Sequence, residues 1–521
     1  RPLDAAGLAD VHVLLDPDGH DYRLQANGQS YLGPFSVQGA IEMPPGGQTV
    51  LAIEALTVNG SQGQGRLLVV DGGLAGRLDF EGSLRGPIDL AVVNGVQQAK
   101  AALQIRQAHF PAATPIDIAR GRLDADMALN PGGTTITAKL VGNGIQVGTM
   151  RINRITAETR LVNGEGKLTA NIIGQRARLF NMPADADIAA DEIGFALTGT
   201  LDRQPISLDR KGRLRRVEGG WALDPLTIRY RGGKAVINSA TFGSEVALDV
   251  GAQNLSLSLL DLSNVDLGLS GTASGRIVYG WSREGGTRGT ATVKVKGLSR
   301  SGVTRTSTPV DIGLNAELTD ARMAMRALIS QDGKIIGKAQ ALMTPLGEGG
   351  LMERLAAAPI RAQLRYVGPA SSLWRLSTIE IIDLSGQIAV TANISGTGAN
   401  PVIDGALMTR DAVLESPVTG MRVTKVQTSG RFNGSRLVLS QISGATGDDG
   451  TVTGRGVFDL GLGQGIGINI ALQADKAVLL NRDDIGATVT GPVSIRSHDG
   501  VNGVISGDFD VVRSRFTMGR A

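Results

Sequence analysis

Strict alternation of apolar and polar side chains marks the stretch TATVKVK, residues 290–296. Because successive side chains of a β-strand point to opposite faces, this stretch predicts a strand with Ala291, Val293 and Val295 on one apolar face. The same alternation recurs in four further stretches, at residues 255–259, 265–270, 387–394 and 466–473. Because each of these strands has one apolar and one polar face, the sequence predicts an antiparallel sheet with one face exposed to solvent.

Turn signals lie between the alternating runs, often at intervals of about ten residues. They are Asn-Gly and Asp-Gly pairs, which supply the positive φ angles of two-residue type I′ hairpins. The pairs begin at Asp18, Asn27, Asn59, Asp71, Asn94, Asn143, Asn163, Asp332, Asn433, Asp449 and Asp499. At roughly 12 residues per strand and turn, the chain would hold on the order of 40 strands.

Helical periodicity is confined to short segments. LMERLAAA at residues 351–358 is the best candidate, and residues 371–376 and 480–484 each predict a single helical turn. The predicted fold is therefore all-β: an elongated, mostly antiparallel, repeating β-groove, shaped like a gutter, with an apolar interior and a few short helices.

Weak internal repetition organises the chain. The tripeptides that end at Gly271, Gly386 and Gly491 are LSG, LSG and VTG, which indicates a repeat of about 105–115 residues. No Ser/Gly/Pro linker or long run of charge interrupts the sequence, so residues 1–521 are expected to form one continuous β-groove. Its first residue is Arg1 rather than Met, and we expect it to be a segment of a longer protein.

The composition excludes several classes of function. Glycine supplies 72 of 521 residues, aromatic residues only 3%, and cysteine none, so disulfides and cysteine-based metal sites are ruled out. The formal net charge of +3 gives no indication of a polyanionic partner. No run of 18 or more apolar residues predicts a membrane-spanning helix.

No catalytic motif is present. The sequence contains no phosphate-binding loop, no HExxH zinc motif and no GxSxG nucleophile elbow, and it has only four histidines. We therefore predict no catalytic, cofactor-binding or metal site and no enzymatic activity. Basic residues cluster modestly at residues 203–216; without interleaved aromatics they indicate a solvated strand face, with a contact to anionic headgroups as the alternative.

The apolar faces are built almost entirely of Leu, Ile, Val and Ala. Such a lining suits a groove along which acyl chains slide, although a small aliphatic core would have the same composition. The predicted groove-lining residues are Leu255, Leu257, Leu259, Leu267, Leu269, Val293, Val295, Ile388, Val390, Ile394, Ile466, Ile468 and Ile470.

A series of short sequence motifs in the second half of the chain resembles a known protein family. The motifs are SLWRL (372–376), LSGQI (384–388), ISGT (394–397), NPVIDG (400–405), ESPVTGM (415–421) and DGTVTGRG (449–456). Over residues 370–515 this order resembles the TamB family, the inner-membrane component of the translocation and assembly module, within the AsmA-like group of bacterial proteins. The resembling part of that family precedes its C-terminal conserved domain.

The resemblance implies a periplasmic protein of a Gram-negative bacterium. Members are anchored in the inner membrane by an N-terminal helix, which residues 1–521 lack, and cross the periplasm as a β-gutter. Their C-terminal region, expected to lie beyond these residues, meets a TamA-like outer-membrane barrel. The implied role is to conduct phospholipids between the membranes and to support outer-membrane integrity and assembly.

Three functional hypotheses follow. The first is a non-enzymatic lipid conduit with phospholipids as partners and without cofactors or nucleic acid. The second is a chaperone-like scaffold that helps to translocate and insert outer-membrane proteins or autotransporters by strand augmentation. The third is a passive surface structure such as an adhesin, whose apolar face would be sealed by protein.

Overall fold

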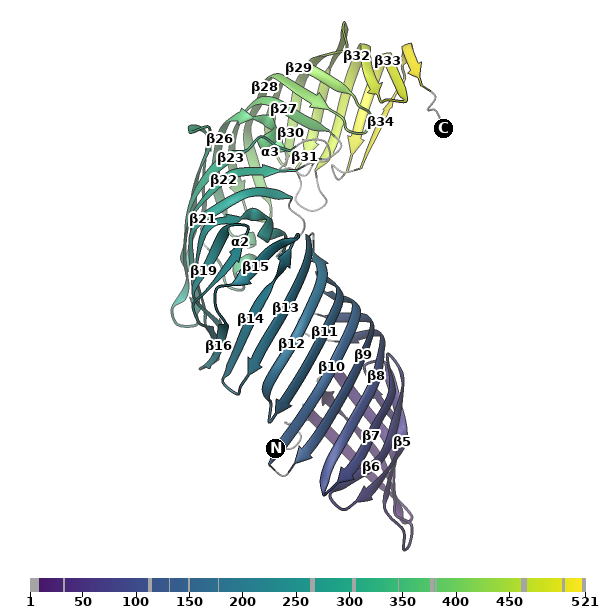
Figure 1. The fold of residues 1–521 in the computed structure, drawn as a ribbon. Coiled ribbons are helices and arrows are strands. Elements are labelled where there is room, and N and C mark those ends of the chain that lie inside the picture. The colour runs from purple at the N-terminus through teal and green to yellow at the C-terminus, as the bar shows by residue number, and fades with distance from the viewer. Residues whose placement is uncertain are drawn as a thin grey trace. The chain divides into compact units, whose positions relative to one another are not determined.

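A computed structural model shows a protein built almost entirely of β-strands (Figure 1). The structure describes residues 9–30, 33–110, 115–130, 132–148, 150–176, 178–262, 268–301, 306–344, 346–374, 379, 382–460, 466–498 and 502–517. These residues contain 35 strands, antiparallel to their neighbours, and three short helical segments. The predicted all-β, antiparallel fold is confirmed.

The chain divides into two compact units, described here one at a time. Unit 1 comprises Arg1–Arg231 with Asp261–Asp266, and unit 2 comprises Gly232–Leu260 with Leu267–Ala521.

Unit 1 is a meander in which β1 to β14 pair in chain order, so that β8 to β13 lie side by side in one layer (Figure 1). At β14 the sheet branches, because β15 pairs with its second half and β16 with its first half. The strands are β1 (Ala9–Asp18), β2 (Asp21–Ser30), β3 (Gly33–Glu42), β4 (Val50–Val58), β5 (Ser61–Val70), β6 (Gly73–Gly82), β7 (Leu84–Val93), β8 (Val96–Phe110), β9 (Ile116–Asn130), β10 (Gly133–Val147), β11 (Met150–Val162), β12 (Glu165–Arg176), β13 (Arg178–Ile188), β14 (Glu192–Leu201), β15 (Gln204–Leu208), β16 (Gly212–Val217), β17 (Gly220–Leu223) and β18 (Leu226–Tyr230).

Unit 2 is a second meander, in which β19 to β33 pair in chain order and both β34 and β35 pair with β33. The strands are β19 (Gly233–Gly243), β20 (Val246–Ser256), β21 (Leu269–Ser282), β22 (Gly286–Arg300), β23 (Val310–Leu318), β24 (Met323–Gln331), β25 (Lys334–Met343), β26 (Ile360–Pro369), β27 (Asp383–Gly396), β28 (Pro401–Glu415), β29 (Arg422–Gly434), β30 (Arg436–Thr446), β31 (Gly450–Asp459), β32 (Gly467–Asn481), β33 (Ile485–Ser497), β34 (Gly503–Gly507) and β35 (Asp510–Phe516). The helical segments are η1 (Leu257–Leu262), α2 (Leu351–Ala357) and α3 (Ala370–Trp374).

The alternation at residues 290–296 has the predicted result. In β22 the side chains of Ala291, Val293 and Val295 are half-buried, whereas the polar side chains between them are exposed. The two helical segments predicted at 351–358 and 371–376 are also confirmed, since α2 and α3 occupy them in the described residues.

Most of the predicted turns are confirmed. Asn59, Asn94 and Asn163 have φ angles of 49°, 54° and 56°, and the glycine after each is also left-handed. This is the type I′ geometry that the pairs predict. The pairs that begin at residues 18, 71, 332, 433 and 449 also border turns, and the pair at 499–500 lies outside the described residues.

Two Asn-Gly pairs do not form turns, and the prediction there is wrong. Gly28 pairs with Phe35 inside β2, where a Cβ would lie 2.9 Å from Cε1 of the Phe35 ring. Glycine at this position therefore makes room for an aromatic ring. Gly144 lies inside β10, and its φ of 64° is accommodated within the strand.

Two further predictions of local structure are corrected. The strand predicted at 255–259 ends at Ser256, and Leu257 opens η1; the hydroxyls of Ser256 and Ser258 lie 2.8 Å apart, a local hydrogen bond that competes with strand pairing. The helical turn predicted at 480–484 is the end of β32 followed by a bend. There the N–H of Asn481 donates to the carbonyl of Thr419 (2.9 Å) rather than to a helical partner.

The glycines that suggested the repeat share one backbone role. Gly271, Gly386 and Gly491 lie inside β21, β27 and β33, with φ angles of 113°, 93° and 141°. A Cβ would lie 2.7 Å from the carbonyl oxygen of Lys296 at the first, 2.8 Å from the Cα of Ala412 at the second and 2.4 Å from the carbonyl oxygen of Asp508 at the third. Both the left-handed φ and the close approach of neighbouring backbone require glycine.

Candidate functional site

A row of apolar side chains crosses seven strands of unit 1 in register. Each member pairs with the next from β8 to β14. Leu103 is buried and the other six are half-buried, while the opposite face of the same strands carries exposed ion pairs such as Lys139–Glu158. We call this row the unit 1 apolar row: Leu103, Leu123, Leu140, Ala157, Ala170, Ala184 and Leu197.

A corresponding row crosses β22 to β27 in unit 2, and only its last member is buried. The unit 2 apolar row consists of Val293, Leu314, Ala327, Ala339, Leu364 and Ala392. Its neighbour on the same face begins at Val295 and runs through Ile312, Ile329, Gly337 and Tyr366 to Val390. Registered pairing therefore places the predicted lining residues of β22 and β27 on one face.

The predicted lining residues differ in how deeply they are buried. Ile388, Val390, Ile468 and Ile470 are 5%, 7%, 3% and 5% exposed and belong to a single buried cluster. Leu255, Leu269, Val293, Val295, Ile394 and Ile466 are half-buried. Leu257 and Leu259 lie in η1, so they do not continue a strand face, and Leu267 lies outside the described residues.

Protein covers the apolar face over β27 to β33. There the buried cluster combines side chains of several strands with Ala370 of α3. The rings of Trp374 and Phe458 pack in a T-shaped arrangement with their centroids 5.9 Å apart, and the indole N–H of Trp374 donates to the carbonyl of Ile382 (2.8 Å). This part of the face is a closed core, whereas the unit 1 and unit 2 apolar rows remain mostly half-buried. Each row is a candidate binding surface of its own unit.

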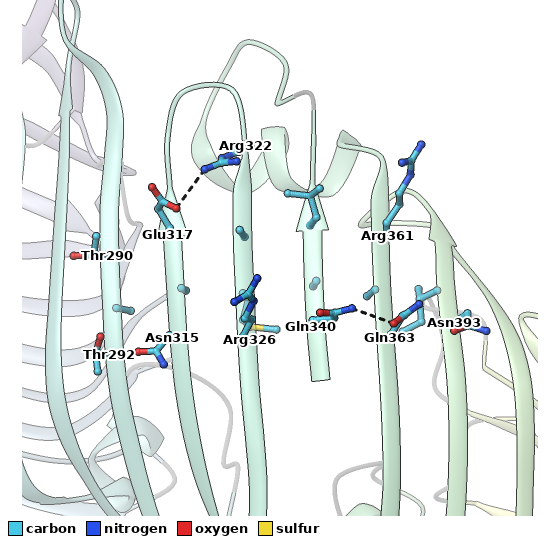
Figure 2. A pocket seen from close by; sticks show the side chains of 18 residues that line it. Thr290, Thr292, Asn315, Glu317, Arg322, Arg326, Gln340, Arg361, Gln363 and Asn393 are labelled. Carbon is cyan, nitrogen blue, oxygen red and sulfur yellow. Dashed lines mark hydrogen bonds and ion pairs between the residues drawn. The ribbon is translucent and has the colours of Figure 1, made fainter. Parts of the chain in front are cut away.

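The opposite, polar face of β22 to β27 holds a pocket of about 890 Å³ (Figure 2). One register row crosses it, and its side chains are exposed. We call it the polar row: Thr292, Asn315, Arg326, Gln340, Gln363 and Asn393. Sequence alone did not reveal the polar row, because its members come together only through strand pairing.

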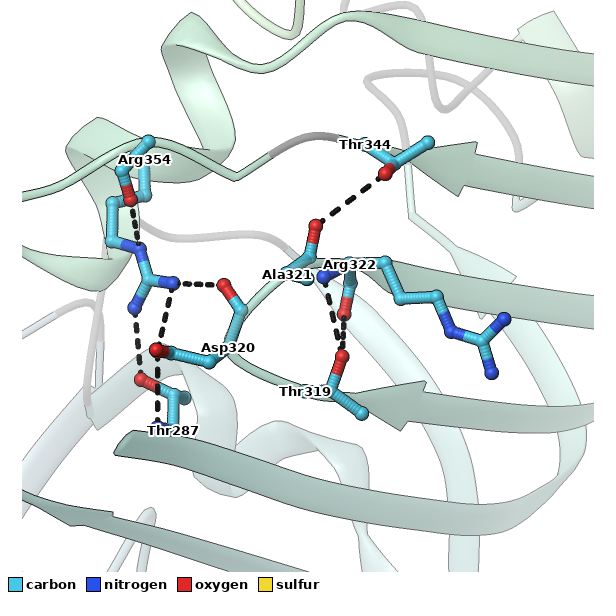
Figure 3. Close-up of polar contacts among 8 residues, drawn as sticks. Thr287, Thr319, Asp320, Ala321, Arg322, Thr344 and Arg354 are labelled. Carbon is cyan, nitrogen blue, oxygen red and sulfur yellow. Dashed lines mark hydrogen bonds and ion pairs between the residues drawn. The ribbon is translucent and has the colours of Figure 1, made fainter. Parts of the chain in front are cut away.

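A buried arginine fixes α2 at the beginning of β22 (Figure 3). Arg354 is 7% exposed, and its Nη1 donates to the hydroxyl of Thr287 (2.8 Å). Its Nε donates to the carbonyl of Gly347 (2.7 Å), and its Nη2 to both the carbonyl and Oδ1 of Asp320. The N–H of Thr287 and the Arg354 guanidinium hold the pKa of Asp320 below its usual value. The sequence signal for this contact was weak: Arg354 lies three residues after Leu351, on the same face of the helix.

Several residues of the basic cluster at 203–216 have polar partners. Lys211 contacts Asp187 (3.1 Å) and Arg215 contacts Asp224 (2.7 Å), and Arg210 donates to the carbonyl of Pro225. These partners agree with a solvated strand face. Within the described ranges, no group of three or more His, Cys, Asp or Glu residues could hold a metal ion. No helix in that part of the chain has the length and apolarity needed to cross a bilayer.

Comparison with known proteins gives no family assignment. No family model matches the chain, and no curated protein matches it. A solved structure described as the P pilus usher (PapC) translocation pore matches with 11% sequence identity and a TM-score of 0.13 over 98% of each chain. A similarity at this level carries no structural argument.

Proposed function

We propose that this protein is a non-enzymatic lipid conduit of the TamB type, located in the periplasm and conducting phospholipids between the inner and outer membranes. The observation that carries the proposal is the pair of registered, largely half-buried aliphatic rows in unit 1 and unit 2. Its partners would be phospholipids, an inner-membrane anchor and a TamA-like outer-membrane barrel. It would support outer-membrane integrity and assembly.

The chemistry of the rows suits acyl chains. Burying hydrocarbon is worth about 0.8 kcal/mol per CH₂. Because every member of the unit 1 apolar row is Leu or Ala, the free energy of burying an acyl chain changes little from one strand to the next. No aromatic ring lies in either row to hold a chain at one place. Headgroups would remain in water at the margin of the apolar face.

The test is native mass spectrometry with lipid extraction on this protein purified under mild conditions. We expect several phospholipids per chain, and fewer in Leu140→Asp, which places a charge within the unit 1 apolar row. The matched control is Thr137→Asp, because Thr137 is exposed on the opposite face of the same strand. A lipid-free wild-type chain, or equal lipid loss in both variants, would contradict the conduit.

One observation favours the second candidate, a scaffold that augments client strands. The strand β35 pairs with β33 along one edge, and Val511, Val512 and Phe516 are exposed on it. A strand at the edge of a sheet that carries exposed apolar side chains can template another strand. Crosslinking from a photoreactive residue at position 512 would capture extended outer-membrane polypeptides if the scaffold is correct. Lipid retention without such capture would favour the conduit.

A further inference from the structure

We infer that the pocket on the polar face of β22 to β27 binds a linear anionic polysaccharide. The pocket lies on the side of the sheet opposite to Val293 and Val295, so the inference does not depend on lipid binding. It rests on three features of the described residues: the register of the polar row, the direction of its hydrogen bonds and the unpaired cations beside it.

The polar row presents a regular series of side chains. Thr292 pairs with Asn315, Asn315 with Arg326, and Arg326 with Gln340, and the series continues through Gln363 to Asn393. Adjacent strands lie about 4.8 Å apart, so polar groups repeat at that interval across six strands. A periodic row of this length fits an extended polymer better than a compact small molecule.

Two hydrogen bonds to amides of the polar row are accepted by the amide oxygens. Gln340 Nε2 donates to Gln363 Oε1 (3.0 Å), and Arg365 Nη2 donates to Asn393 Oδ1 (3.2 Å). Each bond uses one lone pair of the receiving amide oxygen and leaves the NH₂ group of that amide available as a donor. Figure 2 shows the Gln340–Gln363 contact on the face that carries Arg326. A surface of amide N–H groups and guanidinium favours ligands rich in acceptor oxygens, as in carboxylated sugars.

Unpaired cations add a positive field. Within the described residues, no carboxylate pairs with Arg326, Lys338 or Arg361, and the one acidic side chain in the pocket, Glu317, is paired with Arg322 (3.4 Å). Lys338 and Arg365 line an adjoining pocket of about 530 Å³ on the same face. Guanidinium groups bind carboxylates through paired hydrogen bonds. The chain's net charge of +3 conceals this local excess.

Other polyanions fit less well. Single-stranded nucleic acid needs aromatic side chains for stacking, and no aromatic residue lines either pocket. A bilayer surface is broad, whereas these cations line two adjoining pockets, with Arg361, Arg326 and Lys338 in three successive register rows of one face. The polysaccharide is the ligand that agrees with both the periodicity and the absence of aromatics from the lining.

Binding of the full chain to polygalacturonate, measured by isothermal titration calorimetry at low salt, tests the inference, with neutral dextran as the uncharged comparison. We expect binding to polygalacturonate only, and at least about tenfold weaker binding for the double variant Arg326→Gln, Lys338→Gln, because two charge-assisted contacts are lost. The matched control Arg160→Gln removes an exposed arginine of β11 in unit 1 and should leave affinity unchanged. Both variants are compared with the wild type by thermal unfolding to show that they are folded.

Three outcomes would overturn the inference. One is absence of binding by the wild type, and another is an equal effect of the pocket and control variants. The third is binding to vesicles of anionic phospholipid, lost in the pocket variant, without binding to polygalacturonate, which would identify a membrane surface as the ligand.

Discussion

The guanidinium of Arg354 donates a 2.8 Å hydrogen bond to the hydroxyl of Thr287, 67 residues earlier in the chain. Through this contact a two-turn helix, α2, is attached to the beginning of β22. An α-helix of seven residues has little stability of its own, so its position depends on such tertiary contacts.

Replacing Arg354 should release α2 from the sheet. In Arg354→Ala the partners on Thr287, Asp320 and Gly347 lose their donor, and we expect a loss of about 2–4 kcal/mol in the free energy of unfolding. Urea unfolding gives this number, and hydrogen exchange over residues 346–358 should show faster exchange. The control is Met352→Ala on the same helix, since Met352 is 77% exposed. Equal stability of the two variants would mean that Arg354 does not hold the helix.

Asp320 should make stability depend on pH. Its pKa is lowered, first by the N–H of Thr287 and then by Arg354. Because its folded-state pKa lies below the unfolded value, the carboxylate contributes stability above its unfolded pKa. That contribution is lost as the pH falls through the folded pKa.

The experiment compares the free energy of unfolding of the wild type and Asp320→Asn from about pH 6 down to about pH 2. We expect Asp320→Asn to be less stable near neutral pH and the two curves to converge in acid. Asp332→Asn is the control, because Asn suits the positive φ of that hairpin turn equally well. If the two curves run parallel over this pH range, Asp320 does not contribute to the pH dependence of stability.

The repeated glycines should not tolerate a side chain. Gly386→Ala combines a φ of 93° with a Cβ 2.8 Å from the Cα of Ala412, and we expect it to destabilise the protein by about 2 kcal/mol or more. Gly313→Ala is the matched strand control, since its Cβ would meet no atom within 4 Å. Thermal unfolding of both variants checks the difference. Similar melting temperatures would mean that the backbone around Gly386 accommodates a side chain without loss of stability.

The alternation of apolar and polar residues predicted the strands and their faces, but not how deeply each side chain is buried. The alternation around Val293 is a property of neighbouring residues, so sequence sufficed to define that strand and its faces. The depth of Val390 depends on α3 and on strands up to about a hundred residues away, which alternation does not report. At Leu257 the pattern failed because local serine hydrogen bonds compete with strand pairing. The turn predicted at Gly28 is absent because this glycine pairs inside β2 with Phe35 of the adjacent strand, whose ring occupies the space beside it.

Charges introduced on the closed and open parts of the apolar face should have different consequences. Ile468 is 3% exposed and lies in the buried cluster, so Ile468→Asp places a carboxylate where no water or partner compensates it. We expect a loss above about 4 kcal/mol, enough to unfold the region. Val293 is half-buried, so the carboxylate of Val293→Asp can reach water, and a loss of about 1–2 kcal/mol is expected.

Urea unfolding of the two variants, with Thr292→Asp as the exposed control on β22, measures the contrast. Equal and large losses at Val293 and Ile468 would mean that the unit 2 apolar row is sealed by protein in solution. The conduit would then lack an accessible path through β22 to β27. The expected order instead makes Val293→Asp a variant in which lipid retention can be tested on a folded chain, because a lipid loss there would not arise from unfolding.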